Sequence, residues 1–351
     1  MSKIAIVGDL HYGSYDKNSD KYEIIRTSQK SFEDFLVDEL NKRGIKRIIQ
    51  TGDVWDKRYT TSNVTVQDVT DFLTIKLASF SIDIITGNHD LYYNDSFKVS
   101  MLSPLKYIGN ITVYEKPSNI MIDGKRIAML PWIIDSSYDE TMEIVRSKPD
   151  VCIGHLELSD IDMGRGRMST SHINNDEFLS NCKLTLSGHF HHISKTSRHD
   201  HKIIYVGSPF HLNYDDAGMA RGFWILDTDD CSVEFIKNPV SAEFLSIKSD
   251  AINEWDSFSN KVVKITIPAG MSYNDVNDIT NNVASKGPLK YEVISERVQQ
   301  DTVEVEQEQA QVNTDVVSMA KTWYNSIGVS EPEAARAIKI LEKIRKEMEL
   351  I

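Results

Sequence analysis

Aspartate, histidine and asparagine residues recur in short motifs, most of them containing glycine, that follow apolar runs of the sequence. The motifs are Asp9-Leu10-His11, Gly52-Asp53, Gly87-Asn88-His89-Asp90, Gly154-His155 and Gly188-His189-Phe190-His191. Carboxylate, imidazole and amide groups without a thiolate suit Mn²⁺, Fe²⁺ or Zn²⁺, whereas Mg²⁺ alone seldom requires so many histidines. One such motif alone is a weak signal, but their joint occurrence argues against coincidence. The residues therefore predict a site for a pair of divalent metal ions.

The elements that position these motifs follow a strand–helix alternation. The runs "KIAIVGD", "IKRIIQTGD" and "IDIITGNHD" are separated by two amphipathic helical patterns, the first of which stops at Gly44. From about Ile111 the pattern changes to short strands with turns, which indicates a second sheet. We therefore predict an α/β fold, a two-sheet sandwich flanked by helices. Ligands of such sheets bind beyond the carboxyl ends of the strands.

Residue spacing within the motifs predicts which side chains share a face. In an extended strand, residues two apart point to the same side. His189 and His191 are therefore expected to face one site together, as are Asp9 and His11, while Phe190 packs on the opposite side.

Composition limits the classes of protein that the chain could belong to. With 351 residues and 40% hydrophobic content, the sequence predicts a large globular domain with smaller ones. Its longest apolar runs are four or five residues, far below the ~20 that span a bilayer. The scarce cysteines lack CxxC spacing, which favours a reducing cytoplasm. The net charge of −13 argues against a broad basic face for nucleic acid, so bound metal ions would have to attract a polyanion.

Shifts in composition predict four segments. We expect a catalytic domain over residues 1–238, a small α+β capping domain over 239–298, an acidic linker over 299–313 and a helical segment over 314–351. The last helix carries an apolar stripe with no obvious domain left to cover, which makes it a candidate for binding a partner protein. The residues of this stripe are Ala337, Ile338, Leu341, Ile344 and Met348.

The order of the motifs resembles that of the calcineurin-like metallophosphoesterases over about residues 1–230. Within this superfamily, "DLHYG", "GDVWD" and "YVGSPFHLNYDDAG" are similar to the SbcD-type nucleases of double-strand-break repair and their bacteriophage counterparts. The resemblance implies two divalent ions, with Mn²⁺ favoured over Mg²⁺, Fe²⁺ or Zn²⁺. One ion would be held by Asp9, His11 and His191, the other by Asn88, His155 and His189, with Asp53 bridging the two ions.

The same resemblance implies roles beyond metal binding. His89 would stabilise the transition state or protonate the leaving oxygen, and Asp90 would orient His89. The protein would cleave DNA ends and single strands together with an SbcC-type coiled-coil ATPase. The helical stripes near Phe32–Leu40 and Val66–Leu73 are most simply core, but helices of this region pack two subunits together in SbcD-type proteins, so the resemblance implies a homodimer. The protein would work in the cytoplasm, that of the host if phage-encoded.

Several further residues are candidates for contacting DNA. They are Lys57, Arg58 and Tyr59 after the Asp53 motif, Arg165 and Arg167 in a glycine-containing loop, and His211 after the Gly-Ser-Pro segment. For the loop residues an ordinary solvated loop is the competing interpretation, and Asp56 is expected in a turn or supporting role.

Two other functions compete with the nuclease. A phosphatase or small-molecule phosphodiesterase would use the same metals, but it has little need of an acidic linker and an amphipathic C-terminal helix. A non-catalytic scaffold is disfavoured because every ligand position is filled.

Overall fold

The computed structural model describes residues 3–15, 17–296 and Lys339. Residues 1–296 form one compact unit. Within the described ranges no helix has the length and apolarity needed to cross a bilayer. The predicted acidic linker, the helical segment and its partner-binding stripe Ala337, Ile338, Leu341, Ile344 and Met348 lie outside the described residues.

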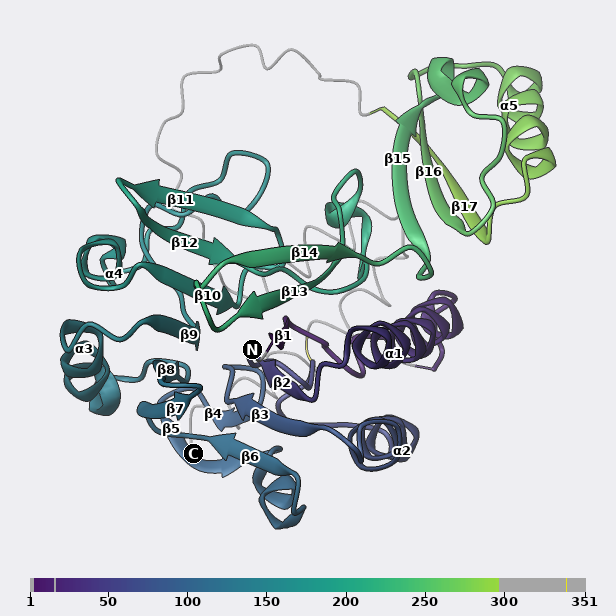
Figure 1. The fold of residues 1–351 in the computed structure, drawn as a ribbon. Coiled ribbons are helices and arrows are strands. Elements are labelled where there is room, and N and C mark those ends of the chain that lie inside the picture. The colour runs from purple at the N-terminus through teal and green to yellow at the C-terminus, as the bar shows by residue number, and fades with distance from the viewer. Residues whose placement is uncertain (1–2, 16, 297–338, 340–351) are drawn as a thin grey trace. The chain divides into compact units, whose positions relative to one another are not determined.

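The first sheet carries the three N-terminal motifs. Its order is β14 (Val233–Lys237), β13 (Gly222–Asp227), β1 (Lys3–Val7), β2 (Arg47–Gln50), β3 (Ser81–Ile85) and β6 (Ile111–Tyr114). Because β1, β2 and β3 run parallel, their carboxyl ends lie at one edge (Figure 1). The helices α1 (Tyr22–Arg43) and α2 (Asn63–Asp71) connect these strands, and α2 continues as a π-helical turn, η1 (Phe72–Lys76).

The ends of these helices follow local chemistry. Gly44 adopts φ 68° and donates its N–H to carbonyls of the last turn, which confirms it as the C-cap of α1. Ser62 caps α2 by accepting a hydrogen bond from the Thr65 N–H. Phe32, Leu36 and Leu40 of α1 are completely buried in the chain's own core, and the partly buried Phe35 packs against it, so this stripe is a core element.

The second sheet carries the two histidine motifs of the later chain. Its order is β11 (Ser194–Arg198), β12 (His201–Tyr205), β10 (Leu184–Gly188), β9 (Val151–His155), β8 (Lys125–Leu130) and β7 (Ser118–Ile122). Ile6 and Ile49 of the first sheet belong to the same core cluster as Ile153 and Leu186 of the second. The helices α3 (Tyr138–Arg146) and α4 (Asn175–Asn181) belong to a separate core cluster with residues of β9 and β12. The predicted two-sheet sandwich flanked by helices is confirmed.

Smaller elements complete the described chain. A third sheet of β15 (Glu243–Lys248), β16 (Lys261–Ile267) and β17 (Lys290–Ser295) shares its own core cluster with α5 (Tyr273–Ser285). This α+β unit lies in the segment predicted to cap the site, and the boundaries 1–238 and 239–298 stay predictions. A hairpin of β4 (Leu91–Tyr93) and β5 (Ser96–Ser100) follows the third motif, and 3₁₀ turns span Ser103–Tyr107, Asp135–Ser137, Tyr214–Asp216 and Ser249–Glu254.

Candidate metal centre

The ends of five strands bring the predicted ligands into one cluster. Three groups of side chains offer ligand atoms within 4.8 Å of one another: Asp9 with His11 and Asp53, Asp53 with His155 and His189, and His11 with Asp56 and His89. The first two groups share Asp53. His191 joins them because its Nε2 lies 2.8 Å from His11 Nε2. The structure therefore brings together the residues that the sequence predicted as ligands.

His155 and Asn88 show how one ligand is oriented. The buried His155 ring donates from Nδ1 to the Thr51 carbonyl at 2.8 Å, which leaves a lone pair on Nε2. That Nε2 lies 2.8 Å from Asn88 Oδ1, and His189 Nδ1 lies 3.1 Å from the same oxygen. Three atoms that can each present a lone pair thus point at one another, an arrangement that suits a shared cation.

Asp9 and His11 fit a second cation. Asp9 is fully buried and its Oδ2 has no hydrogen-bond partner in the described part of the chain, while its Oδ1 accepts the His189 N–H at 3.0 Å. A buried carboxylate oxygen without a partner is costly unless a cation or a donor meets it. The Nε2 atoms of His11 and His191, which lie 2.8 Å apart, supply imidazole ligands. The side chains therefore fit a pair of divalent ions.

Asp53 lies at the centre of the cluster. Its Oδ2 is 3.7 Å from His11 Nε2 and 3.4 Å from His155 Nε2, while its Oδ1 accepts the His89 N–H at 2.8 Å. Gly87 must be glycine here, because a Cβ would lie 2.3 Å from Asp53 Oδ1. This position between the two histidine groups fits the predicted bridging role.

The backbone corrects one reason given for the shared faces. His11 and His189 have φ values of 46° and 85°, and Asp53 has φ 54°. These left-handed residues are not extended, so alternation along a strand does not place their side chains. Strained backbone of this kind concentrates at functional sites. Phe190 is buried in the core with its ring centroid 4.6 Å from that of Tyr205. Its ring also lies 4.9 Å from that of His189, so it borders the site and does not face the opposite side.

The surroundings of the histidines shift their pKa values in opposite directions. Burial alone would lower the pKa of His155, but the carboxylates of Asp53 and Asp9 outweigh it and raise that pKa to about 9. Burial and the nearby His155 charge lower the pKa of His189 to about 3. Burial, with the charge of His11, holds the pKa of His191 well below its usual range. His189 and His191 are therefore neutral at pH 7, whereas His155 must release a proton before it can bind a metal.

The residues predicted to handle protons are placed differently from expectation. His89 Nδ1 lies 2.5 Å from the Asp56 carbonyl oxygen, to which it donates. Asp90 is completely buried and accepts the N–H groups of Gly87, Asp53 and Trp55. Asp90 therefore connects its own motif to the loop that carries Asp53 by hydrogen bonds. The ring of His89 is held instead by the Asp56 carbonyl, which takes the orienting role expected for Asp90.

The residues predicted to contact DNA differ in their exposure and in the contacts they make within the chain. Lys57 and Arg58 are half-buried, and Tyr59 is exposed with its ring 5.0 Å from that of Tyr92 on β4. Arg167 is exposed, whereas Arg165 donates to the Tyr214 carbonyl at 2.9 Å. One nitrogen of the Arg165 guanidinium is therefore hydrogen-bonded within the chain.

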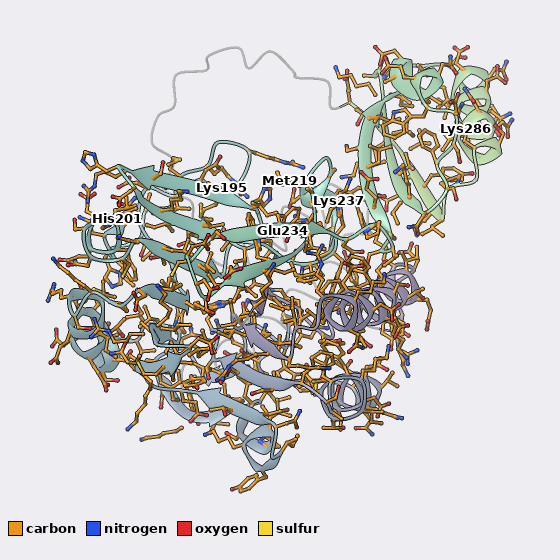
Figure 2. The ribbon with its side chains drawn as sticks, viewed as in Figure 1. Lys195, His201, Met219, Glu234, Lys237 and Lys286 are labelled. Carbon is orange, nitrogen blue, oxygen red and sulfur yellow. The ribbon has the colours of Figure 1, made fainter. Side chains whose placement is uncertain are left out.

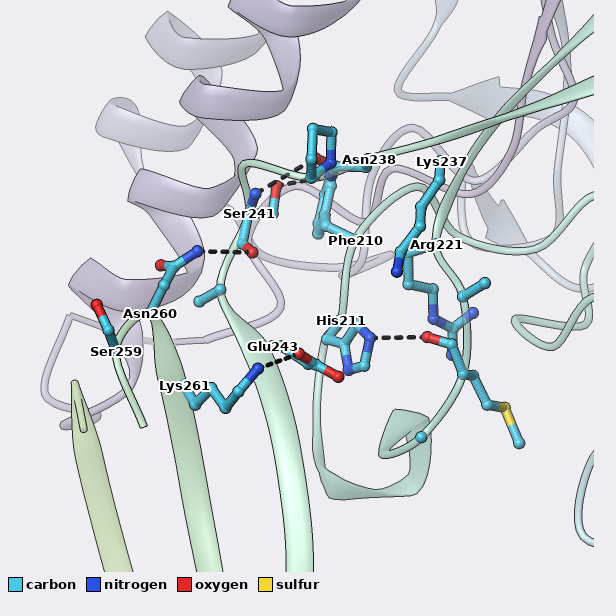
Figure 3. A pocket seen from close by; sticks show the side chains of 15 residues that line it. Phe210, His211, Arg221, Lys237, Asn238, Ser241, Glu243, Ser259, Asn260 and Lys261 are labelled. Atoms are coloured by element: carbon cyan, nitrogen blue, oxygen red, sulfur yellow. Dashed lines mark hydrogen bonds and ion pairs between the residues drawn. The ribbon is translucent and has the colours of Figure 1, made fainter. Parts of the chain in front are cut away.

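His211 is a structural connector rather than an exposed contact. It is buried, its Nδ1 accepts the Phe244 N–H at 3.2 Å and its Nε2 donates to the Met219 carbonyl at 3.0 Å. It lines a cavity of about 580 Å³ beside Lys237 and the Glu243–Lys261 ion pair (Figure 3). Figure 2 labels Lys237 at the end of β14. With both ring nitrogens bonded to main-chain groups, His211 has no free nitrogen for DNA.

The tertiary structure adds two residues that sequence reasoning missed. The Trp132 ring lies 5.0 Å from that of His189 and 6.1 Å from that of His155, measured between centroids. Arg221 is buried, pairs with Asp216 and donates to the His191 carbonyl. Neither residue belongs to a motif. The one available signal concerned Trp132, which follows the apolar strand Lys125–Leu130 as the ligands follow theirs. Arg221 lies before an apolar strand, Gly222–Asp227, and gave no such signal.

Comparisons with known proteins agree with this geometry. Residues 2–193 match the family described as calcineurin-like phosphoesterase. The chain is 33% identical over 240 residues to exonuclease subunit 1 of Enterobacteria phage T4, an overlap of 67% of this chain and 68% of that protein.

Two solved structures are more distant. A dimetal phosphatase from Danio rerio is 11% identical with a TM-score of 0.44, covering 64% of this chain and 91% of that one. A phosphopantetheinyl hydrolase from Mycobacterium tuberculosis is 12% identical with a TM-score of 0.37, covering 59% of this chain and 90% of that one.

The family match spans more than half of the chain and contains all the predicted ligands, from Asp9 to His191. The prediction from the motifs is confirmed: the chain belongs to the calcineurin-like phosphoesterase family, and it is a phosphoesterase enzyme.

Proposed function

We propose that this protein is a metal-dependent DNA nuclease subunit that hydrolyses phosphodiesters as an exonuclease on duplex ends and an endonuclease on single strands. The observation that carries the proposal is the 33% identity to a phage exonuclease subunit over two thirds of both chains. The ligand cluster supports it, because Asp9, His11, Asp53, His155 and His189 form two groups, sharing Asp53, that could each hold a metal ion. A phosphatase acting on small substrates is the alternative within the same family.

The chemistry divides between the ions and the chain. Two divalent cations, Mn²⁺ in our proposal, would neutralise the phosphate oxygens and acidify an attacking water. Asp9, His11 and His191 would hold one cation, Asn88, His155 and His189 the other, and Asp53 both. His89 donates from Nδ1 to the Asp56 carbonyl, so its Nε2 carries a proton only when the ring is the doubly protonated imidazolium. In that form His89 would give the Nε2 proton to the leaving oxygen.

Substrate contacts would come from the loop after Asp56. Lys57 and Arg58 offer cations for backbone phosphates, and the exposed ring of Tyr59 offers a face for a base. Arg165 and Arg167 would add cations from the later loop. Local positive charge of this kind, together with the metal ions, offsets the net charge of −13.

Two protein partners are part of the proposal. The relative is named as a subunit, which supports assembly with an SbcC-type ATPase through the C-terminal stripe. Deleting the chain from Asn313 onward should abolish co-purification with such an ATPase. Cleavage of simple substrates should survive, and association that persists would contradict this docking site.

A homodimer is the second proposed assembly. Val64, Val66 and Ile75 are more than 40% exposed on α2 and η1, whereas the α1 stripe is buried. The exposed apolar residues of α2 and η1 are therefore the candidates for pairing two copies, and a monomer mass by light scattering of the full chain would contradict the dimer.

The decisive experiment compares substrates. The purified protein with Mn²⁺ should degrade duplex and single-stranded DNA, and chelation with EDTA should stop the reaction. Fast hydrolysis of a phosphomonoester without action on DNA would favour the phosphatase. Stoichiometric Mn²⁺ binding without hydrolysis of either substrate would favour the scaffold.

A further inference from the structure

Asp56 lies between two histidines with different tasks. Its carboxylate Oδ1 is 3.3 Å from His11 Nδ1, and its carbonyl oxygen accepts from His89 Nδ1 at 2.5 Å. The two imidazole rings are neighbours, with centroids 5.0 Å apart and perpendicular planes. The side chain of Asp56 thus lies beside Nδ1 of the proposed metal ligand His11, and its carbonyl accepts from Nδ1 of the proposed proton donor His89.

The His11 side of this contact is the more informative. His11 Nδ1 is buried and forms no hydrogen bond among the described residues. The Asp56 carboxylate oxygen, 3.3 Å away, is an acceptor placed beside it. A histidine that binds a metal through one nitrogen almost always donates from the other to a carboxylate or carbonyl, which fixes its tautomer. Such hydrogen bonds are often poorly aligned before a site is complete.

The backbone of Asp56 is itself held in place. Its N–H donates to the Tyr12 carbonyl at 3.1 Å, and the Tyr12 N–H donates to the Val54 carbonyl at 2.9 Å. Tyr12 also pairs with Trp55 in an isolated parallel bridge. These bonds fix the Asp56 loop against the segment that carries His11, so the carbonyl that receives His89 does not depend on the Asp56 side chain.

We propose that Asp56 is a positioning residue that orients His11 through its carboxylate and His89 through its carbonyl. The inference rests on the proposed two-metal function and deepens it. The carboxylate keeps His11 in the tautomer with a free lone pair on Nε2. The carbonyl keeps the His89 Nε2 turned away from the loop, available to the leaving oxygen.

The carboxylate part is tested by metal binding without DNA. In calorimetric Mn²⁺ titrations, Asp56→Ala should weaken binding of one of the two ions by about 10–100-fold. Asp56→Asn keeps an oxygen that can accept the His11 N–H, so it should restore most of that affinity. Asp95→Asn, which removes a charge from the exposed turn between β4 and β5, is the matched control and should bind both ions like the wild type.

Two results would overturn this part. Unchanged affinity in Asp56→Ala would show that the carboxylate does not support His11. Equal loss in Asn and Ala would show that the charge itself binds the cation. The melting temperature in EDTA should match the wild type in all variants, which separates these outcomes from misfolding. Because no DNA is present, the result stands whether or not the nuclease proposal survives.

The carbonyl part is tested by comparing Asp56→Gly with Asp56→Ala. Glycine frees the backbone while removing the same carboxylate. We expect Asp56→Gly to lower kcat several-fold below Asp56→Ala, with Mn²⁺ affinity and KM equal in the two. Equal kcat values would show that the Asp56 carbonyl does not position His89.

Discussion

Replacing His89 with asparagine is expected to lower DNA cleavage by roughly 10²–10⁴-fold, the usual contribution of a general acid. Asparagine keeps a hydrogen-bonding side chain but has no group that transfers a proton near neutral pH. The His89 N–H would still donate to Asp53 Oδ1, because that contact, 2.8 Å in the native chain, comes from the backbone. Mn²⁺ binding should therefore stay within a few-fold of the wild type while kcat falls.

The measurement is single-turnover cleavage of a labelled duplex, paired with a Mn²⁺ titration of the same preparation. His199→Asn is the matched control, since His199 is exposed in the turn between β11 and β12 and has φ 56°, a conformation that asparagine tolerates. The control should cleave at the wild-type rate. Loss of metal together with activity in His89→Asn would instead make His89 a ligand.

Replacing Asp53 with asparagine is expected to have the largest effect on metal binding. Its Oδ2 lies within 4 Å of the ring nitrogens of both His11 and His155, so one substitution removes charge from both halves of the cluster. A smaller effect opposes the first: the Asp53 charge contributes to the raised pKa of His155, so its loss makes it easier for His155 to release the proton that competes with a metal ion. We expect affinity for both ions to fall more than about 100-fold, beyond the loss typical of supporting residues, and cleavage to become undetectable.

Thermal unfolding measures this loss independently of activity. A ligand at about 100 times its Kd adds about 2.7 kcal/mol to the free energy of unfolding, so Mn²⁺ should raise the wild-type Tm but not that of Asp53→Asn. Asp83→Asn is the control: Asp83 is equally buried but pairs with Arg47 and Tyr114. It should lower the Tm in EDTA and leave the Mn²⁺-induced rise intact. A full Mn²⁺ response in Asp53→Asn would exclude Asp53 as a shared ligand.

Much of the site could be predicted because its ligands directly follow apolar strands. The strands at Lys3–Val7, Arg47–Gln50 and Ser81–Ile85 are parallel neighbours, so residues just beyond their ends must lie at one edge. The same local reasoning identified Gly44 as the end of α1, since a left-handed C-cap depends on a single residue type. Motif order and strand periodicity were therefore sufficient for the family, the fold and the set of side chains that cluster as candidate ligands.

What the sequence could not determine is the set of contacts between residues that no motif links. Aspartate at position 90 reads as a partner for the adjacent His89, yet its oxygens accept N–H groups from the loop of Asp53. His211 resembles a residue of the site rim but bonds to two main-chain groups, and Arg221 reaches the His191 carbonyl from a separate strand.

These contacts depend on how loops turn, and left-handed residues such as His11 and His189 break the alternation on which sequence patterns rely. Strand ends are set locally by hydrophobic patterning, and so the sequence alone determined which side chains meet at the metal centre. The partner of each ring nitrogen is set by packing between distant segments, and only the tertiary structure decided it.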